Sequence, residues 1–303
     1  MRSRRTQKSA ITTNLTLPTP ITKLRLRDRE FLIKRDDLAH DELSGNKFRK
    51  LQKLIDTPRE RYDTIISYGG TQSNAMLAIA YLAKSKGWRF RYYTKSLSKR
   101  LREKPSGNLE RALLLNMELV EVAHASYETT IRSLFVGFDD RTRLVAQGGA
   151  DGIARYGIEK LADELRMQLP LDEVVLVTPS GTGTTAYYLA QSLDCDIYTS
   201  AVVGDSAYLR AQMRSLGDIA ENLHILDGVP YRFAMPHSDL LAIYRELSDA
   251  GVTFDLLYAP VTWLRLLEHL KRFQEKRIVY IHSGGVSGNA SMLERYRYKG
   301  LID

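Results

Sequence analysis

Residues Ser44-Gly-Asn-Lys-Phe-Arg-Lys-Leu51 combine the start of a helix with a lysine that the helix itself does not need. Ser44 or Asn46 would cap this helix. Its apolar stripe would consist of Phe48, Leu51 and Ile55. Lys47 then lies in the first turn, where a positive charge opposes the helix dipole. A solvated lysine fits this position, but so does a Schiff-base lysine, because an amine near a positive helix end in a desolvated pocket has a lowered pKa.

Around this segment, short β-branched or aromatic runs alternate with amphipathic patterns along the chain. The predicted strands cover residues 30–34, 64–68, 90–94, 119–122, 174–178, 197–203, 256–258 and 278–282. The predicted helices cover residues 75–84, 108–115, 158–167, 186–191, 238–247 and 263–273. This repeated strand-helix-strand order predicts an α/β fold with parallel sheets flanked by helices.

Four glycine clusters fall at or near the ends of predicted strands, where open α/β sheets bind their ligands. They are Gly69-Gly70, Gly148-Gly149, Gly181-Thr-Gly183 and Gly284-Gly285. One such loop would be weak evidence. Several together predict a crevice lined by backbone amides and helix N-termini, which suits phosphate and carboxylate groups.

Two of these loops carry polar side chains at a helix start. The first is a candidate phosphate cup made of Gly181, Thr182, Gly183, Thr184 and Thr185. It has neither the lysine of a nucleoside-triphosphate loop nor the spacing of a dinucleotide loop, so a monophosphate fits it better. The second is a donor cluster able to hold a substrate carboxylate, made of Thr71, Gln72, Ser73 and Asn74. Each loop alone could be an ordinary turn or capping motif.

In this order the segments resemble the 1-aminocyclopropane-1-carboxylate (ACC) deaminase and D-cysteine desulfhydrase family of pyridoxal 5′-phosphate (PLP) enzymes, which have the tryptophan-synthase-β-like fold, fold type II. The resemblance covers nearly the whole chain. It rests on Arg35-Asp-Asp-Leu38, residues 44–51, residues 69–74, Gln147-Gly-Gly-Ala-Asp-Gly152, the threonine-rich loop, Leu257-Tyr-Ala-Pro-Val261 and Ile281-His-Ser-Gly-Gly285. It implies a homodimer of two-domain subunits. Residues 1–51 plus 151–303 would form the larger, PLP-binding domain, and residues 52–150 a smaller inserted α/β domain.

The resemblance also implies roles for individual residues. Lys47 matches the lysine that binds PLP covalently and moves protons at the substrate. Asn74 matches the partner of the PLP 3′-oxygen, and Ser283 a hydroxyl beside the pyridine nitrogen. The carboxylate loop is matched by Thr71, Gln72 and Ser73, and the phosphate loop by Gly181, Thr182, Gly183, Thr184 and Thr185. Ser73 and Tyr231 join Lys47 as candidate catalytic residues.

Two departures from the family bear on the reaction. A tyrosine commonly follows the Asp-Pro-Val that Ala259-Pro-Val261 resembles, and Thr262 stands at that place here. The next position is acidic in the deaminases and is Trp263 here. Tyr231, in Pro230-Tyr-Arg-Phe-Ala-Met-Pro236, is the candidate for a second active-site tyrosine. These differences weigh against opening a cyclopropane ring.

The resemblance predicts a PLP-dependent lyase or deaminase that acts on a small amino acid by α,β-elimination, giving a 2-oxoacid and ammonia. A racemase, a β-replacement enzyme and a PLP-binding protein without turnover remain alternatives. The net charge of +8 would also suit a nucleic-acid binder. Its cations are mixed with Asp and Glu on predicted helix faces, as on an ordinary solvated surface, so no nucleic-acid partner is expected.

The remaining composition sets limits on location and metal use. No apolar run reaches the roughly 20 residues of a membrane span, and the basic residues 1–8 lack the apolar core of a secretory signal. Cys195 is the only cysteine, predicted to be a buried apolar residue that forms no disulfide. We therefore expect a cytoplasmic protein. The six scattered histidines predict no structural metal site.

Overall fold

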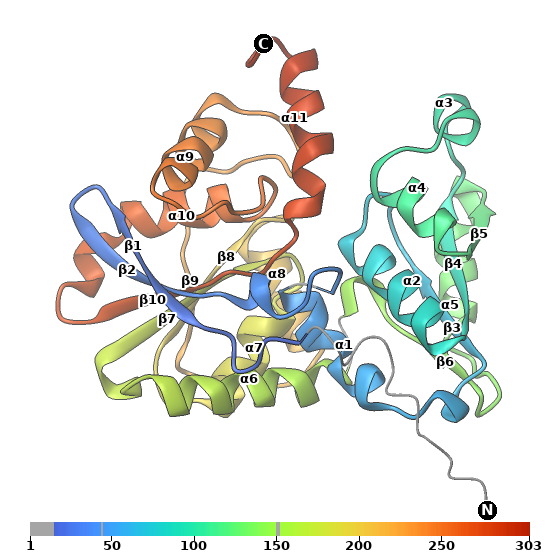
Figure 1. Ribbon diagram of the computed structural model, residues 1–303, viewed down its shortest axis with the longest axis horizontal. Coiled ribbons are helices and arrows are strands. Elements are labelled where there is room, and N and C mark those ends of the chain that lie inside the picture. Colours follow the sequence, from blue (N-terminus) through green and yellow to red (C-terminus); the bar gives the residue numbers. More distant parts are fainter. Residues whose placement is uncertain (1–14, 44, 150–151) are drawn as a thin grey trace, which may run out of the picture.

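The computed structural model describes residues 15–43, 45–149 and 152–303 and contains two separate sheets (Figure 1). The larger sheet has the strand order β1-β2-β10-β7-β8-β9 and is parallel except for the antiparallel pair β1 and β2. The smaller sheet has the order β5-β4-β3-β6 and is parallel throughout. The predicted α/β fold with parallel sheets flanked by helices is confirmed.

The elements have the following bounds. The strands are β1 (Ile21–Leu26), β2 (Arg29–Lys34), β3 (Thr64–Tyr68), β4 (Arg89–Lys95), β5 (Met117–Val122), β6 (Thr142–Leu144), β7 (Val174–Ser180), β8 (Ile197–Ala201), β9 (Leu223–Ile225) and β10 (Arg277–Ile281). The helices are α1 (Asn46–Asp56), α2 (Asn74–Lys86), α3 (Lys99–Glu103), α4 (Gly107–Leu114), α5 (Tyr127–Ser133), α6 (Ala154–Gln168), α7 (Thr184–Ser192), α8 (Ser206–Arg214), α9 (Ser238–Asp249), α10 (Ala259–Glu268) and α11 (Asn289–Tyr298).

Both faces of the larger sheet are covered, and its central strand β7 shows how. Val174 and Leu176 pack against α6, α7 and α8, whereas Val175 and Val177 pack against α9 and α10. Every residue of β7 is buried. A central parallel strand therefore appears in the sequence as a continuous apolar run rather than an alternating one.

Helix α1, which carries Lys47, packs against the smaller sheet through its apolar side. Phe48, Leu51, Leu54 and Ile55 lie in one core with residues of α2, α4 and one face of this sheet. Helix α5 covers the opposite face. The predicted apolar stripe is thereby confirmed. The alternative capping residue, Asn46, is instead the first residue of α1, and Gly45 is at the N-cap. Ser44, the basic residues 1–8 and the motif residues Ala150 and Asp151 lie outside the described residues.

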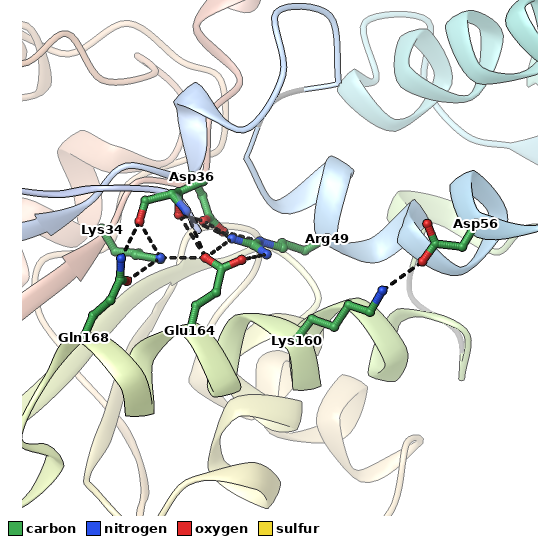
Figure 2. Close-up of polar contacts among 8 residues, drawn as sticks. Lys34, Asp36, Arg49, Asp56, Lys160, Glu164 and Gln168 are labelled. Carbon is green, nitrogen blue, oxygen red and sulfur yellow. Dashed lines mark hydrogen bonds and ion pairs between the residues drawn. The ribbon is translucent and has the colours of Figure 1, made fainter. Parts of the chain in front are cut away.

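The other side of α1 is joined to the larger sheet by a network of buried charges (Figure 2). The Arg49 guanidinium donates to Asp36 and to Glu164, each at 2.8 Å. Lys34 Nζ of β2 donates to the same Glu164 of α6 at 2.7 Å. Two cations and two anions therefore balance each other, and all four side chains are buried. This network fixes α1 against β2 and α6.

Most predicted elements are found, and the main error lies before α10. Residues 256–258 were expected to be a strand but form a turn, because the Asp255 carboxylate accepts the backbone N–H groups of Leu257 and Tyr258. These bonds turn the chain into α10, which starts at Ala259 rather than at Trp263. Asp255 acts here much as a helix-capping side chain does.

Arg49→Met should lower the free energy of unfolding by about 3–5 kcal/mol, because it leaves the Asp36 carboxylate buried without its cation and Glu164 paired with Lys34 alone. Lys160→Met is the matched control, since the ion pair of Lys160 and Asp56 joins the same two helices at an exposed position, at 2.9 Å. Its loss should cost at most about 1 kcal/mol. Urea unfolding followed by circular dichroism measures both values. Equal losses would show that the buried network has no special role.

Candidate active site

The turn in front of Lys47 is pressed against the end of β10. Gly45 has a φ of +61°, and a Cβ atom there would lie 1.9 Å from the Ser283 carbonyl oxygen. The backbone N–H of Asn46 donates to that same oxygen at 3.0 Å, and the N–H of Gly45 donates to the Asp36 carbonyl at 2.8 Å. Only glycine has both the backbone freedom and the small size that this contact requires.

Lys47 is the second residue of α1 and is partly buried. Burial lowers the pKa of its amine to about 8, and the Asp255 carboxylate opposes this shift. Burial also raises the pKa of Asp255 to about 6, although backbone N–H groups and Lys47 stabilise its ionised form. The lowered lysine pKa expected from the sequence is thus present, with desolvation as its largest cause.

The loop after β3 brings polar side chains to the start of α2. Ser73 caps this helix, since its hydroxyl accepts the N–H of Met76 at 3.2 Å. The Gln72 side chain reaches α4, where it donates to the Ser106 carbonyl and accepts the N–H of Asn108, both at 3.0 Å. Two of the predicted carboxylate-binding side chains therefore also hold the loop in place. The Ser73 hydroxyl also hydrogen-bonds to the Tyr92 side chain, so Ser73 is held by two partners.

Groups from the ends of both sheets converge beside Lys47. A Cβ atom at Gly285, which follows β10, would lie 3.0 Å from Asn74 Nδ2 and 3.7 Å from Asp255 Cβ. Asn74 belongs to α2 of the smaller sheet, whereas Asp255 precedes α10 on the larger one. The structure therefore brings Asn74 and Asp255 together around the glycine turn after Ser283.

The threonine-rich loop joins β7 to α7 as predicted. Gly183, with a φ of +75°, precedes α7, and no side chain caps the first turn of this helix. The hydroxyls of Thr182 and Thr184 lie 2.9 Å apart. A Cβ atom at Gly181 would lie 3.3 Å from the ring of Tyr258. Backbone N–H groups at the uncapped helix start suit a phosphate group.

The buried hydroxyl of Ser283 supports a fit to PLP. Its Oγ finds no hydrogen-bond partner among the described residues, and neither does the Thr178 hydroxyl of β7. A buried hydroxyl without a partner costs free energy, so a ligand atom that pairs with it would recover that cost. The pyridine nitrogen of PLP would be such a partner. A lysine of lowered pKa, an uncapped glycine loop and this hydroxyl together match the functional groups of PLP.

The structure corrects the sequence assignment of Thr262 and Trp263. The Thr262 hydroxyl is buried and pairs with Ser200 at 2.7 Å. Trp263 is fully buried in the core, where it stacks on Tyr280 with ring centroids 4.6 Å apart. Both residues of α10 are thus used in packing, so neither corresponds to an active-site tyrosine or acid.

Tyr258 is a further candidate for the active-site tyrosine, one that the sequence analysis did not assign. It follows Asp255-Leu-Leu just as the family tyrosine follows Asp-Pro-Val, and its ring lies beside Gly181. Burial and the nearby Asp255 raise the pKa of Tyr258 to about 12. In this register Ala259 occupies the position that is acidic in the deaminases. The sequence contains the aspartate of this motif at Asp255, four residues before Ala259, the residue first matched to it.

Tyr231 and Phe233 lie on one loop but face different neighbours. The Tyr231 hydroxyl lies 3.5 Å from Asp239 of α9, and its ring packs edge-on against His237. The Phe233 ring lies 5.5 Å from that of Tyr258. Phe233 is therefore the aromatic residue of this loop that packs on Tyr258, and the catalytic role of Tyr231 stays a prediction.

Within the described ranges, no group of three or more His, Cys, Asp or Glu side chains is placed to hold a metal ion. None of the helices seen there has the length and apolar character to cross a bilayer. Cys195 is buried as predicted, and burial raises the pKa of its thiol to about 11.

Sequence and structure comparisons agree on the relatives of this chain. A D-cysteine desulfhydrase of Salmonella schwarzengrund is 29% identical over 307 residues, covering 88% of this chain and 92% of that protein. A bifunctional D-cysteine desulfhydrase/1-aminocyclopropane-1-carboxylate deaminase of Arabidopsis thaliana is 27% identical over 311 residues, covering 90% and 77%. The chain is a homologue of these enzymes. No family model matches the sequence.

The solved structures support the same fold. The crystal structure of an ACC deaminase homologue superposes with a TM-score of 0.71 at 20% identity, covering 93% of this chain and 95% of that one. The processed form of threonine deaminase isoform 2 from Solanum lycopersicum superposes with a TM-score of 0.61 at 13% identity, covering 96% and 86%. This homologue of the deaminases and desulfhydrases therefore has the fold type II architecture of PLP enzymes.

In protein without cofactor, labelling of Lys47 by an amine-reactive reagent should rise with pH through a midpoint near 8, because only the neutral amine attacks. Asp255→Asn should move this midpoint lower, since the carboxylate stabilises the ammonium form. Mass spectrometry of labelled peptides measures both, with the exposed Lys99 as internal reference. A Lys47 midpoint near the ordinary value of 10.5 would contradict the described burial.

Proposed function

We propose that this protein is a PLP-dependent lyase that removes a β-substituent from a small amino acid and releases a 2-oxoacid and ammonia. The observation that carries the proposal is the partly buried Lys47 of lowered pKa, in a turn that the Ser283 backbone carbonyl holds. The Ser283 hydroxyl is buried and finds no partner among the described residues. The names of the homologous desulfhydrases and deaminases support the same chemistry.

In this proposal residues from the ends of both sheets would hold the cofactor. Lys47 binds it covalently, the loop from Gly181 to Thr185 holds its phosphate, and Asn74 donates to its 3′-oxygen. Ser283 pairs with the pyridine nitrogen. When bound, PLP withdraws electrons from the substrate α-carbon, and a neutral hydroxyl partner makes the ring a weaker electron sink than a carboxylate would.

The protein groups divide the remaining work. Thr71, Gln72 and Ser73 receive the substrate carboxylate through their hydrogen-bond donors and the loop amides. The Lys47 amine takes the α-proton. Tyr258, whose pKa is raised from 10 to about 12, carries its proton at neutral pH, and its hydroxyl would donate to the departing β-substituent.

The acidic position of the deaminases is Ala259 in the corrected register. Opening a cyclopropane ring requires an additional proton transfer to carbon, for which this position supplies no acid. We therefore place β-substituted amino acids such as D-cysteine ahead of ACC as substrates. A racemase, a β-replacement enzyme and a PLP-binding protein without turnover are the alternatives that the experiments below separate.

We further propose that residues 1–51 with 151–303 form the PLP-binding domain and residues 52–150 the smaller domain. The two sheets support this division, since β3 to β6 all lie between residues 64 and 144. A cytoplasmic homodimer is part of the same proposal. It rests on the family resemblance and on the single, buried Cys195.

The purified protein with PLP should absorb visible light, and one of D-cysteine, L-cysteine, serine, alanine or ACC should shift the band and yield 2-oxoacid and ammonia. Lys47→Ala should abolish covalent PLP binding, as tested by borohydride reduction and mass spectrometry. A band shift without product would favour a racemase or β-replacement enzyme, and a band that no amino acid moves would favour a protein without turnover. Covalent PLP on the Lys47→Ala protein would contradict the proposal.

Tyr258→Phe should lower kcat for the active substrate by about 10²–10⁴-fold with little change in PLP affinity, because it removes only the proton donor. Thr262→Val removes a hydroxyl in the same helix region and should retain most activity, since Thr262 bonds to Ser200 inside the core. Steady-state kinetics of both variants show whether Tyr258 or Thr262 stands at the position of the family tyrosine. A larger loss of kcat in Thr262→Val than in Tyr258→Phe would favour the first alignment, with Thr262 at the tyrosine position.

A further inference from the structure

Asn108, at the start of α4, bonds to two residues of the predicted substrate and cofactor loop. Its Nδ2 group donates to the Gln72 carbonyl at 3.0 Å and to Asn74 Oδ1 at 2.8 Å. Its backbone N–H donates to Gln72 Oε1 at 3.0 Å. Asn108 is only 3% exposed. None of the motifs singled out in the sequence includes this residue.

These bonds decide which end of the Asn74 amide faces the site. A side-chain amide can turn by 180° with almost no change in shape, so its hydrogen bonds determine its orientation. The Gln72 carbonyl is a backbone acceptor, so the atom of Asn108 next to it must be the donor Nδ2. The Asn74 atom that pairs with the same Nδ2 group must then be the acceptor Oδ1.

The opposite end of Asn74 is the donor Nδ2, which faces Gly285. A Cβ atom at Gly285 would lie 3.0 Å from this nitrogen. The 3′-oxygen of PLP carries negative charge and needs a donor, whereas an amide oxygen turned toward it would repel it. Binding of PLP at the proposed place therefore depends on the orientation that Asn108 imposes.

We propose that Asn108 is a positioning residue that holds the Asn74 amide with its donor toward the 3′-oxygen of PLP. The inference rests on the proposed function, because it requires PLP beside Lys47. Asn108 itself contacts Asn74 and Gln72, so its effect on the cofactor passes through Asn74. Asn108 and Asn74 are 34 residues apart in the sequence and lie on different helices, α4 and α2.

A double-mutant cycle tests this role through the dissociation constant of PLP, measured by titrating cofactor-free protein and following absorbance. Asn74→Ala and Asn108→Ala should each weaken PLP binding about tenfold, as expected for one hydrogen bond to a charged group. The double variant should bind no more than about twofold more weakly than Asn74→Ala, because Asn108 has nothing left to orient. Fully additive losses, or unchanged binding by Asn108→Ala, would overturn the proposal.

Asn108→Asp provides a directional test. Its carboxylate accepts and would pair with the Asn74 Nδ2 group, turning Oδ1 toward the cofactor. It should therefore bind PLP more weakly than Asn108→Ala, and the difference should disappear when Asn74 is replaced by alanine. Binding at least as tight as that of Asn108→Ala would contradict the proposed orientation. If Asn108→Ala fails to fold, Asn108→Ser takes its place in the cycle.

Asn222→Ala is the control for loss of a partly buried amide. Asn222 also donates through Nδ2 to two acceptors, the carbonyls of Leu193 at 2.7 Å and Cys195 at 3.0 Å, but it lies directly before β9, at the edge of the larger sheet. Its PLP affinity should equal that of the original protein. An equal weakening would mean that any lost amide has this effect and would overturn the proposal.

The cycle also separates this inference from the function on which it rests. If the unaltered protein does not bind PLP, the proposed function fails and the positioning role fails with it. If the unaltered protein binds PLP and Asn108→Ala binds it equally well, only the positioning role is lost.

Discussion

Charge neutrality inside the protein is the constraint on which the rest of the structure depends. Arg49, Lys34, Asp36 and Glu164 are all buried, and each needs its partners because a lone buried charge would cost several kcal/mol. This requirement fixes the distance between α1 and the larger sheet more strictly than apolar packing would, since carboxylate and guanidinium groups must meet at hydrogen-bond distance. Lys47 lies two residues before Arg49, so the same geometry determines where its amine can reach.

The candidate site is built from element ends that other parts of the fold hold still. The turn before Lys47 is fixed by the Ser283 carbonyl, and the loop before Asn74 is fixed by Gln72 and Asn108. Both turns are held by hydrogen bonds to a backbone carbonyl or from a backbone amide rather than by apolar packing. Hydrogen bonds are directional, which apolar packing is not. A glycine at position 45 and an amide at position 108 are therefore structural requirements of the same kind.

How much of this could be predicted from sequence depended on whether the determining contacts were local. The run Val174 to Val177 predicted a central strand because both faces of such a strand are buried. Lys47 could be proposed as a site residue because its motif is contiguous. Asn108 could not be identified this way, because its role comes from partners on another helix. The false strand at residues 256–258 has a different origin. The contacts of Asp255 that turn the chain are local, but the apolar content of the segment was interpreted as a strand.

One physical effect, desolvation, shifts the pKa values of the proposed base and the proposed acid in opposite directions. Burial disfavours every charged form, so it favours the neutral amine of Lys47 and the neutral, protonated form of Tyr258. Asp255 experiences the same cost, but the backbone N–H groups that it receives and the nearby Lys47 stabilise its ionised form, and its pKa reaches only about 6. Near neutral pH this site can thus contain a carboxylate, a lysine close to its titration point and a proton-bearing tyrosine. One desolvated environment can therefore hold a charged carboxylate beside a neutral amine and a neutral phenol, because backbone N–H groups stabilise the charge of Asp255 alone.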